Sequence, residues 1–394
     1  MRHSARPIIT WDAPSANRSD SWHSIVIAMV RALAAIEVAA AHLRALFYPG
    51  MRTITDPTLW YQGFAFFTGF AHQAVLLFFV ISGWLVGGSL LDKWNQRDAL
   101  RHYAVDRITR LWTVLIPVFV LSLLLGLGIG QLDGGTFDYA ASNEFSVASF
   151  FGNLAGLQLI SVPAFGGNFP LWSLSNETWY YILFPLLVVT VRTERLGLRT
   201  LSALMIALLA LALPPLLLLY FMIWLLGAAC SRLQLNCGRG ARMALIAVAA
   251  ATSVYFRLTG RNDDLSVASF IPDLILTIMF LAILCSLQNT KAPTAPAMLR
   301  IAKTGRYFAE FSFTLYVIHY PLIVLLEFVA LKFYGVEKLT PSNPLHLGAY
   351  LAMLCFIMVG AWLSYLLFES RTAQIRNWVK RKLLRKAAAV VVPA

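Results

Sequence analysis

The feature that most constrains this chain is its succession of long apolar segments. Hydrophobic residues make up 59% of the 394 residues and charged residues only 13%, against roughly 25% charged residues in soluble domains. A segment of about 20 apolar residues is long enough to cross a bilayer as a helix. The sequence therefore predicts an all-α polytopic membrane protein, a bundle of about ten transmembrane helices. The expected spans are 25–47, 71–91, 111–130, 172–191, 200–213, 215–231, 243–257, 270–288, 311–331 and 347–368.

The distribution of basic residues predicts the orientation of these spans. If the N-terminus is cytoplasmic, the inside segments contain 25 of the 32 Lys and Arg residues, the outside loops contain six, and Arg31 lies within the first span. An excess of basic residues in inside loops is the usual signal of membrane topology. We therefore expect both termini to be cytoplasmic. The net charge of +13 follows from topology, and no nucleic-acid partner is expected.

The chain is expected to form one membrane domain, 25–368, between a cytoplasmic segment, 1–24, and a basic cytoplasmic tail, 369–394. The tail is expected to form a helix that rests on anionic lipid headgroups. The longest outside segment, 131–170, contains no Lys or Arg, and its second half could dip into the membrane. The four cysteines show neither metal-ligand spacing nor a convincing disulfide pair, so no metal site is expected.

Arg31 and His42 lie in the first span, eleven positions apart. At ~100° per residue this spacing puts both side chains on one helix face, about 16 Å apart along the axis. Ionisable groups at membrane depth usually face a bundle interior or a water-filled cavity, and a neutral imidazole is a natural general base. The alternatives are an arginine that reaches toward the cytoplasmic headgroups and a histidine at the outer interface.

A second cluster surrounds the loop after the second span. Ser82 and Gly83 lie in that span, and Arg107 and Arg110 precede the third span at a spacing of three, so that they are neighbours on a helix. Guanidinium groups bind phosphates through fixed, planar donors. The alternative for the two arginines is ordinary positive charge on the inner side.

Two further clusters belong to spans 172–191 and 311–331. Trp172, Ser173 and Glu177 begin the first of these, where aromatic faces beside a carboxylate could hold a sugar; the alternatives are an interfacial aromatic residue and an acidic residue near a helix N-terminus. His319 lies near the middle of the other span, and Pro321 leaves a backbone carbonyl without its helical donor nearby. The alternative is a structural histidine bonded to that carbonyl or to a neighbouring helix.

Taken together, these segments resemble the acyltransferase 3 family of integral-membrane acyltransferases. The likeness extends in order from about residue 25 to 370. It rests on Arg31…His42, on Phe78-Phe79-Val80-Ile81-Ser82-Gly83, on Arg107-Ile-Thr-Arg110, on Trp172-Ser173-Leu174…Glu177 and on Leu315-Tyr316…His319-Tyr320-Pro321.

The resemblance implies a bacterial inner-membrane enzyme that moves an acyl group, most often acetyl, from cytoplasmic acyl-CoA to a hydroxyl of a cell-surface or exported saccharide. No bound cofactor is implied, because acyl-CoA is a co-substrate. The implied partners are acyl-CoA, membrane lipid and an exopolysaccharide, lipopolysaccharide or oligosaccharide acceptor. The expected site residues are catalytic His42, Arg31 and Glu177, donor-binding Arg107, Arg110 and Ser82, and acceptor-binding Trp172, Ser173 and His319.

Several points stay open at this stage. His42 could deprotonate the acceptor or first accept the acyl group itself, and the acceptor and the acyl chain are not identified. Glu37 and the segment 71–74, Ala-His-Gln-Ala, depart from the family pattern, and neither Asp273 nor Glu327 has an assigned role. The competing function is a transporter or flippase of a glycolipid or an acylated small molecule, which leaves the paired arginines unexplained.

Overall fold

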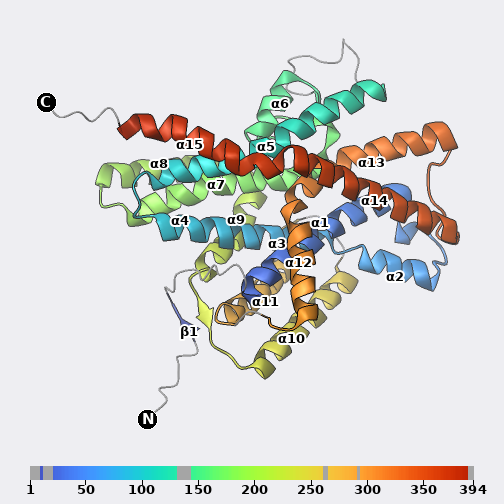
Figure 1. The fold of residues 1–394 in the computed structure, drawn as a ribbon, viewed down its shortest axis with the longest axis horizontal. Helices are drawn as coiled ribbons and strands as arrows, with labels where there is room; N and C mark the ends of the chain where they lie inside the picture. Colours follow the sequence, from blue (N-terminus) through green and yellow to red (C-terminus); the bar gives the residue numbers. More distant parts are fainter. Residues whose placement is uncertain (1–8, 12–20, 131–142, 261–264, 291–292, 389–394) are drawn as a thin grey trace. The chain divides into compact units, whose positions relative to one another are not determined.

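The chain is built almost entirely of helices, as expected. The structure, a computed structural model, describes residues 9–11, 21–130, 143–260, 265–290 and 293–388. Figure 1 shows the order of the elements along the chain. The α-helices are α1 (Trp22–Phe47), α2 (Leu59–Phe67), α3 (Ala71–Ser82), α4 (Gly88–Lys93), α5 (Ala99–Gly128), α6 (Val147–Leu154), α7 (Trp172–Arg192), α8 (Leu196–Ala212), α9 (Pro215–Cys230), α10 (Arg239–Thr259), α11 (Phe270–Leu287), α12 (Pro296–Glu310), α13 (Ser312–Tyr334), α14 (Pro344–Leu367) and α15 (Thr372–Ala388).

Shorter elements connect these helices. A π-helical turn, η2 (Gly83–Gly87), joins α3 to α4. Strands β1 (Ile9–Thr10) and β2 (Gln234–Leu235) form one antiparallel pair. The remaining elements are the 3-10 turns η1 (Met51–Thr53), η3 (Phe165–Gly167), η4 (Phe169–Leu171) and η5 (Glu369–Arg371).

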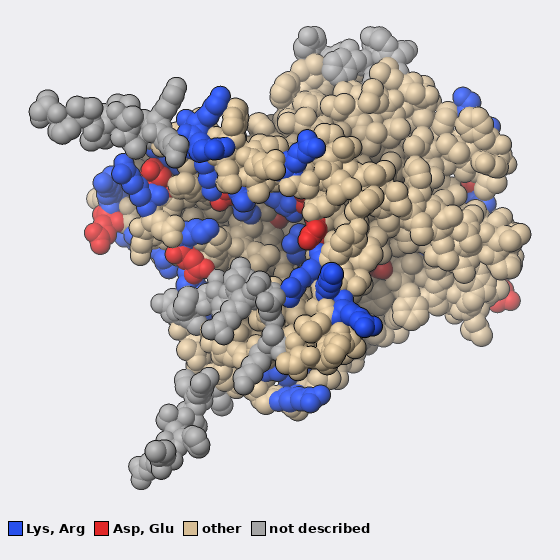
Figure 2. Space-filling view, viewed as in Figure 1, with Lys and Arg blue, Asp and Glu red and all other residues tan. Residues whose placement is uncertain are grey.

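Each of the ten predicted spans coincides with a helix or helical run, so the prediction of a multi-pass helical membrane protein is confirmed. Within the described residues, seven helical runs are both long and apolar enough to cross a bilayer, and α8 and α9 are shorter apolar helices. Helix α7 is not among the seven, because its first two turns are polar. On the face shown in Figure 2, Lys and Arg gather in patches and leave broad surfaces without charge, as helices in contact with lipid require.

The sequence did not single out α2, α6 or α12. Helix α6 lies in the long outside segment, of which residues 131–142 are outside the described part of the chain. Its N-terminus is capped by Ser146, whose Oγ accepts a hydrogen bond from the backbone N–H of Ser149 at 3.0 Å. This segment therefore contains a regular, capped helix.

Contacts divide the chain into two compact units, each described by itself. The first comprises Met1–Ala41, Phe66–Asp92 and Thr190–Ser312, and the second comprises His42–Ala65, Lys93–Val189 and Phe313–Ala394. Helix α1 passes from the first unit into the second between Ala41 and His42.

The core of the first unit is formed by α1, α3, α9 and α11. Its buried side chains include Val80, Trp84 and Leu284. Two glycines let η2 and α3 approach α9 closely: a Cβ at Gly83 would lie 2.0 Å from the carbonyl oxygen of Trp224, and a Cβ at Gly227 would lie 2.3 Å from that of Val80. The Ser82-Gly83 motif therefore has a role in helix packing.

The second unit is organised around α5, which contacts α6 and α15. Buried Phe119 and Phe165 pack with their ring centroids 4.9 Å apart. The basic tail forms helix α15, and Lys380 Nζ lies 2.6 Å from Asp106 Oδ1 of α5. The tail is thus held against α5 by charge as well as by packing.

Candidate functional site

Two histidines meet in the second unit. Nδ1 of His42, near the end of α1, lies 2.8 Å from Nε2 of His319 in α13. The two rings are stacked, with centroids 5.1 Å apart and an interplanar angle of 13°. His319 is completely buried, whereas His42 is only partly buried. The pair therefore joins the predicted cluster in span 25–47 to the predicted cluster in span 311–331.

The backbone determines which nitrogens of this pair carry protons. Nδ1 of His319 lies 2.7 Å from the carbonyl oxygen of Tyr316. Because a carbonyl can only accept, this Nδ1 carries the proton, and Nε2 of a neutral His319 is an acceptor. Nδ1 of His42 then donates to it, and Nε2 of a neutral His42 is left with the lone pair. That lone pair is what a general base or a nucleophile needs.

The segment before α7 supports α13 beside this pair. Pro321 has no N–H, so the carbonyl of Val317, four residues earlier, lacks its helical donor. Nδ2 of Asn168 donates to that carbonyl at 2.9 Å. The ring of Phe169 packs edge-on against both His42 and Tyr320, with centroid distances of 5.0 and 4.8 Å. The carbonyl freed by Pro321 is thus satisfied by Asn168, and His319 bonds a different carbonyl.

Two positive backbone angles allow this segment to turn. Gly166 and Gly167 have φ values of 62° and 67°, in the left-handed region that favours glycine. A Cβ at Gly167 would also lie 3.0 Å from Oε2 of Glu144. Both glycines are therefore required by the loop that delivers Asn168 and Phe169 to α13.

Trp172 and Ser173 begin α7 in the same unit. The Ser173 hydroxyl lies 2.5 Å from the hydroxyl of Tyr316, which donates to the carbonyl of Pro170 at 3.0 Å. Ser173 and Tyr316 are buried and Trp172 is partly buried. Ser173 is bonded to Tyr316, whose carbonyl orients His319. The hydrogen bond of Ser173 therefore has a structural role.

Glu177 and Arg107 share an aromatic neighbour. The Tyr181 hydroxyl donates to Oε1 of Glu177 at 2.5 Å, and the guanidinium of Arg107 lies over the Tyr181 ring at 5.7 Å from its centroid. The ring of Tyr103 flanks the same guanidinium at 6.0 Å. Nε of Arg107 is buried and has no hydrogen-bond partner in the described part of the chain. A predicted donor-binding residue and a predicted catalytic carboxylate thus belong to one cluster.

Arg110 is held by the buried carboxylate of Glu369. Nη1 of Arg110 pairs with Oε1 of Glu369, and Oε2 accepts from both the backbone N–H and the hydroxyl of Thr314, at 3.1 and 2.5 Å. The guanidinium also lies 4.9 Å from the ring centroid of Phe313. Glu369 was not predicted as a site residue, since its position just after an apolar span reads as an ordinary boundary charge.

The other predicted site residues, Arg31 and Ser82, lie in the first unit. Nη2 of Arg31 donates to the hydroxyl of Ser312 at 3.3 Å, and the hydroxyl of Ser82 accepts from the indole of Trp224 at 3.1 Å. Glu37 accepts from the backbone N–H of Phe70 at 2.7 Å. Ser82 is therefore bound within the interface with α9.

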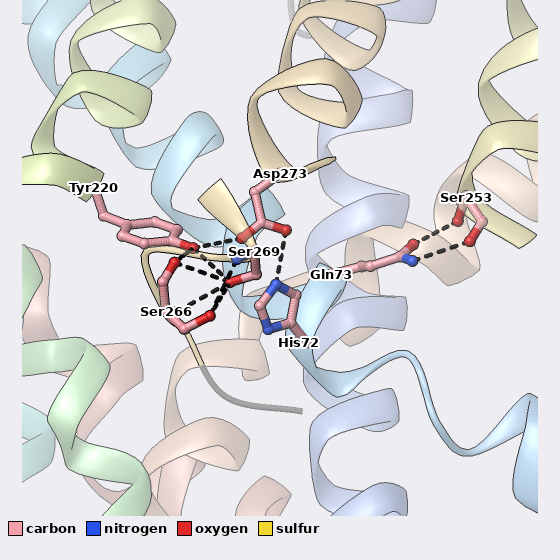
Figure 3. A network of polar contacts seen from close by, with 7 residues as sticks. All are labelled: His72, Gln73, Tyr220, Ser253, Ser266, Ser269 and Asp273. Atoms are coloured by element: carbon pink, nitrogen blue, oxygen red, sulfur yellow. Dashed lines mark hydrogen bonds and ion pairs between the residues drawn. The ribbon is translucent and has the colours of Figure 1, made fainter. Parts of the chain in front are cut away.

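The first unit also contains a polar cluster that the sequence left without a role. Nε2 of His72 lies 2.7 Å from Oδ1 of Asp273, and Oδ2 of Asp273 accepts from the hydroxyl of Tyr220 at 2.5 Å (Figure 3). Glu327, the other carboxylate without a role, is exposed. Within the described residues, no group of three or more His, Cys, Asp or Glu side chains could hold a metal ion.

Comparison with known families identifies the chain. The model of the acyltransferase 3 family, described as an acyltransferase domain, matches residues 26–369. No curated protein and no solved structure matches the sequence. The match covers most of the chain and includes every residue of the predicted clusters.

Proposed function

Because this chain belongs to the acyltransferase 3 family of membrane O-acyltransferases, we propose that it transfers an acyl group, most often acetyl, from acyl-CoA to a hydroxyl of a cell-surface or exported saccharide. The observation that carries the proposal is the pairing of His42 with His319 at 2.8 Å. The proposal places the protein in a bacterial inner membrane, with acyl-CoA on the cytoplasmic side. The family match gives no support to the transporter alternative.

The reaction uses the lone pair that the histidine pair leaves on His42. Nε2 of His42 takes the proton of the acceptor hydroxyl as its oxygen attacks the thioester carbonyl. The bond between the carbonyl carbon and sulfur then breaks, and the CoA thiolate takes the proton back from His42. His319 is a positioning residue, because its bond to the carbonyl of Tyr316 fixes the tautomer of His42. A role for Arg31 in orienting the thioester stays a prediction, because Arg31 lies about three helical turns from His42 on α1.

The donor is proposed to bind at the two arginines of α5. A guanidinium has five N–H donors, so Arg110 keeps donors for a phosphate while Glu369 holds it in place. Arg107 offers a buried Nε without a partner among the described residues. Fixed, planar donors favour a phosphorylated ligand such as the nucleotide end of acyl-CoA. The donor-side role of Ser82, which lies in the first unit, stays a prediction.

The acceptor is proposed to lie beside the start of α7. Glu177 and Trp172 would supply a carboxylate and an aromatic face for a sugar, and Ser173 bonds to Tyr316 beside them. Two contacts support this proposal: Ser173 bonds to Tyr316 of α13, the helix of His319, and Tyr181, which bonds to Glu177, lies under Arg107 of α5.

The test is acyl transfer in membranes that contain the protein. Membranes with the unaltered protein or with Arg107→Ala/Arg110→Ala are given acetyl-CoA labelled in the acetyl group, together with cell-envelope glycans. The label is expected on the glycans with the unaltered protein and is expected to be lost with the double variant. In a control without glycans, acetyl label that stays on the protein itself would contradict direct transfer through a general base. Absence of transfer from both acetyl-CoA and succinyl-CoA would contradict the saccharide acceptor.

A further inference from the structure

Two cavities adjoin each other in the first unit. The larger, about 310 Å³, lies between the start of α3, the end of α10 and the start of α11. The smaller, about 150 Å³, lies along the same three helices. Gln73 and Leu276 line both cavities, so one ligand could occupy the two at once. The larger volume lies at the lower end of the range of about 300–1,000 Å³ typical of ligand sites.

The larger cavity is lined by groups that donate and groups that accept hydrogen bonds. His72, Arg257, Ser266, Ser269 and Asp273 contribute to it, beside the rings of Tyr255 and Phe256. Figure 3 shows Asp273 between His72 and Tyr220, whose hydroxyl also lies 3.1 Å from Oγ of Ser269. This network fixes the carboxylate and the imidazole before any ligand binds.

The charges of the larger cavity select a neutral polar ligand. The carboxylate of Asp273 would repel an anion, and the guanidinium of Arg257 would repel a cation. That guanidinium lies against Gly69, where a Cβ would be 1.8 Å from Nη2 of Arg257. A neutral group with many hydroxyls can bond to both residues. Tyr255 supplies a largely exposed ring for the apolar face of a sugar.

The smaller cavity has a different chemistry. Most of its lining is apolar, from Leu76, Leu77, Val80, Ala249, Phe280 and Ile283. Gln73 and Ser253 mark the boundary with the larger cavity and satisfy each other, because Nε2 of Gln73 donates to the Ser253 carbonyl at 3.1 Å and the Ser253 hydroxyl donates to Oε1 of Gln73 at 2.5 Å. Such a lining favours a hydrocarbon chain.

The position of α10 gives a bilayer lipid access to these cavities. None of its described residues is buried, so the helix lies at the periphery of its unit. The pattern of Lys and Arg puts the C-terminal end of α10 and the N-terminal end of α11 on the outer side. The polar cavity is therefore on the outer side, and the apolar cavity lies deeper along the helices.

We propose that the two cavities together bind one glycolipid, with a neutral saccharide headgroup in the larger cavity and a hydrocarbon chain in the smaller. His72 and Asp273 recognise the hydroxyls of the headgroup, and Gln73 lies at its junction with the chain. This proposal is separate from acyl transfer, because it requires the glycolipid to bind but not to react.

The test measures protection of a thiol in the larger cavity. Ala268 lines that cavity and is exposed, so Ala268→Cys in the full chain reacts with a charged maleimide when the four native cysteines are replaced by alanine. The protein is placed in lipid nanodiscs, and the rate of labelling is measured with dodecyl maltoside, with maltose, or with dodecylphosphocholine, below concentrations that dissolve the nanodiscs. Dodecyl maltoside has both parts of the proposed ligand, whereas each of the other probes has only one.

The expected result is a progressive loss of labelling with dodecyl maltoside, little effect of maltose at the same concentration, and no effect of dodecylphosphocholine. Ala249→Phe, which fills the smaller cavity, should remove the advantage of the maltoside over maltose. Val248→Phe is the matched control, because Val248 is exposed on α10 and lines neither cavity.

Three results would overturn the proposal. Equal protection by maltose would show that the site does not bind the hydrocarbon chain. Equal protection by dodecylphosphocholine would show that it has no preference for a sugar. No protection by any probe would show that the cavities are not a binding site for such a ligand. Because the readout is binding, failure here leaves the acyltransferase proposal intact, and failure of the acyl-transfer assay leaves this one intact.

Discussion

Nδ1 of His42 lies 2.8 Å from Nε2 of His319, although the two residues are 277 positions apart in the chain. The carbonyl of Tyr316 fixes the proton on the other nitrogen of His319 and thereby the tautomer of His42. A histidine in α13 thus leaves the lone pair on Nε2 of a histidine in α1, which the proposed general base requires.

This relationship predicts different outcomes for two substitutions of His319. His319→Leu removes the acceptor for Nδ1–H of His42, so we expect the rate of acyl transfer to fall by about 10²-fold. His319→Gln retains an oxygen that can accept the bond and should recover a large part of the loss. Rates at saturating acyl-CoA, with the melting temperatures of both variants, provide the measurement. Equal loss in the two variants at equal stability would show that the bond does not matter.

The contact between Asn168 and the carbonyl of Val317 predicts a rescue. Asn168→Leu leaves that buried carbonyl without a donor, which should lower the free energy of unfolding by about 1–3 kcal/mol. Pro321→Ala restores the missing helical N–H, so the double variant should be more stable than Asn168→Leu alone. Unfolding of the purified protein in detergent measures both effects. Strictly additive changes in the double variant would refute the proposed pairing.

The ion pair of Arg110 with Glu369 predicts a loss of stability together with weaker donor binding. The side chain of Glu369 is 2% exposed and that of Arg110 is 31% exposed, so the cost of about 3–5 kcal/mol for removing one partner of a fully buried pair is an upper bound here. Glu369→Gln should therefore destabilise the protein by a large part of that amount and raise the KM for acyl-CoA.

Asp98→Asn provides the comparison for this pair. Asp98, which is partly buried, pairs with exposed Arg101 at 3.2 Å on the surface, for which the expected change is at most about 1 kcal/mol. Similar losses of stability in Glu369→Gln and Asp98→Asn would mean that the pair with Arg110 is not a structural element of the donor site.

The close approach of η2 to α9 predicts that Gly83 tolerates no side chain. In Gly83→Ala the new Cβ would lie 2.0 Å from the carbonyl oxygen of Trp224, so the amount of folded protein extracted from membranes should fall sharply. Gly348→Ala is the control, because a Cβ at Gly348 in α14 would meet no atom within 4 Å, and alanine is the better helix former. Normal yields of Gly83→Ala would contradict the described packing.

Local patterns predicted most of the helices but few of the tertiary contacts. Each of the ten apolar windows coincides with a helix or helical run, and seven such runs are long and apolar enough to cross a bilayer, because hydropathy is a property of the segment itself. Amphipathic α12 and short α6 were missed because neither is a long apolar run, and their stability depends on what they pack against.

Periodicity relates residues within one helix, so it paired Arg31 with His42 and Arg107 with Arg110. It could not pair His42 with His319 or His72 with Asp273, since these contacts depend on how helices pack. Pro321 did signal a carbonyl without a donor, but its partner, Asn168, lies in a loop whose course depends on Gly166 and Gly167. The roles of the site residues stay predictions.

The most direct test of the central claim compares His42→Ala with His346→Ala in the labelled-acetyl transfer assay. His346 accepts a bond from the backbone N–H of Thr340 at 2.6 Å and belongs to none of the proposed sites. We expect His42→Ala to lower transfer by about 10²- to 10⁴-fold, the range attributed to a general base, while His346→Ala retains it. Full transfer by a folded His42→Ala protein would contradict the assignment of His42 as the base.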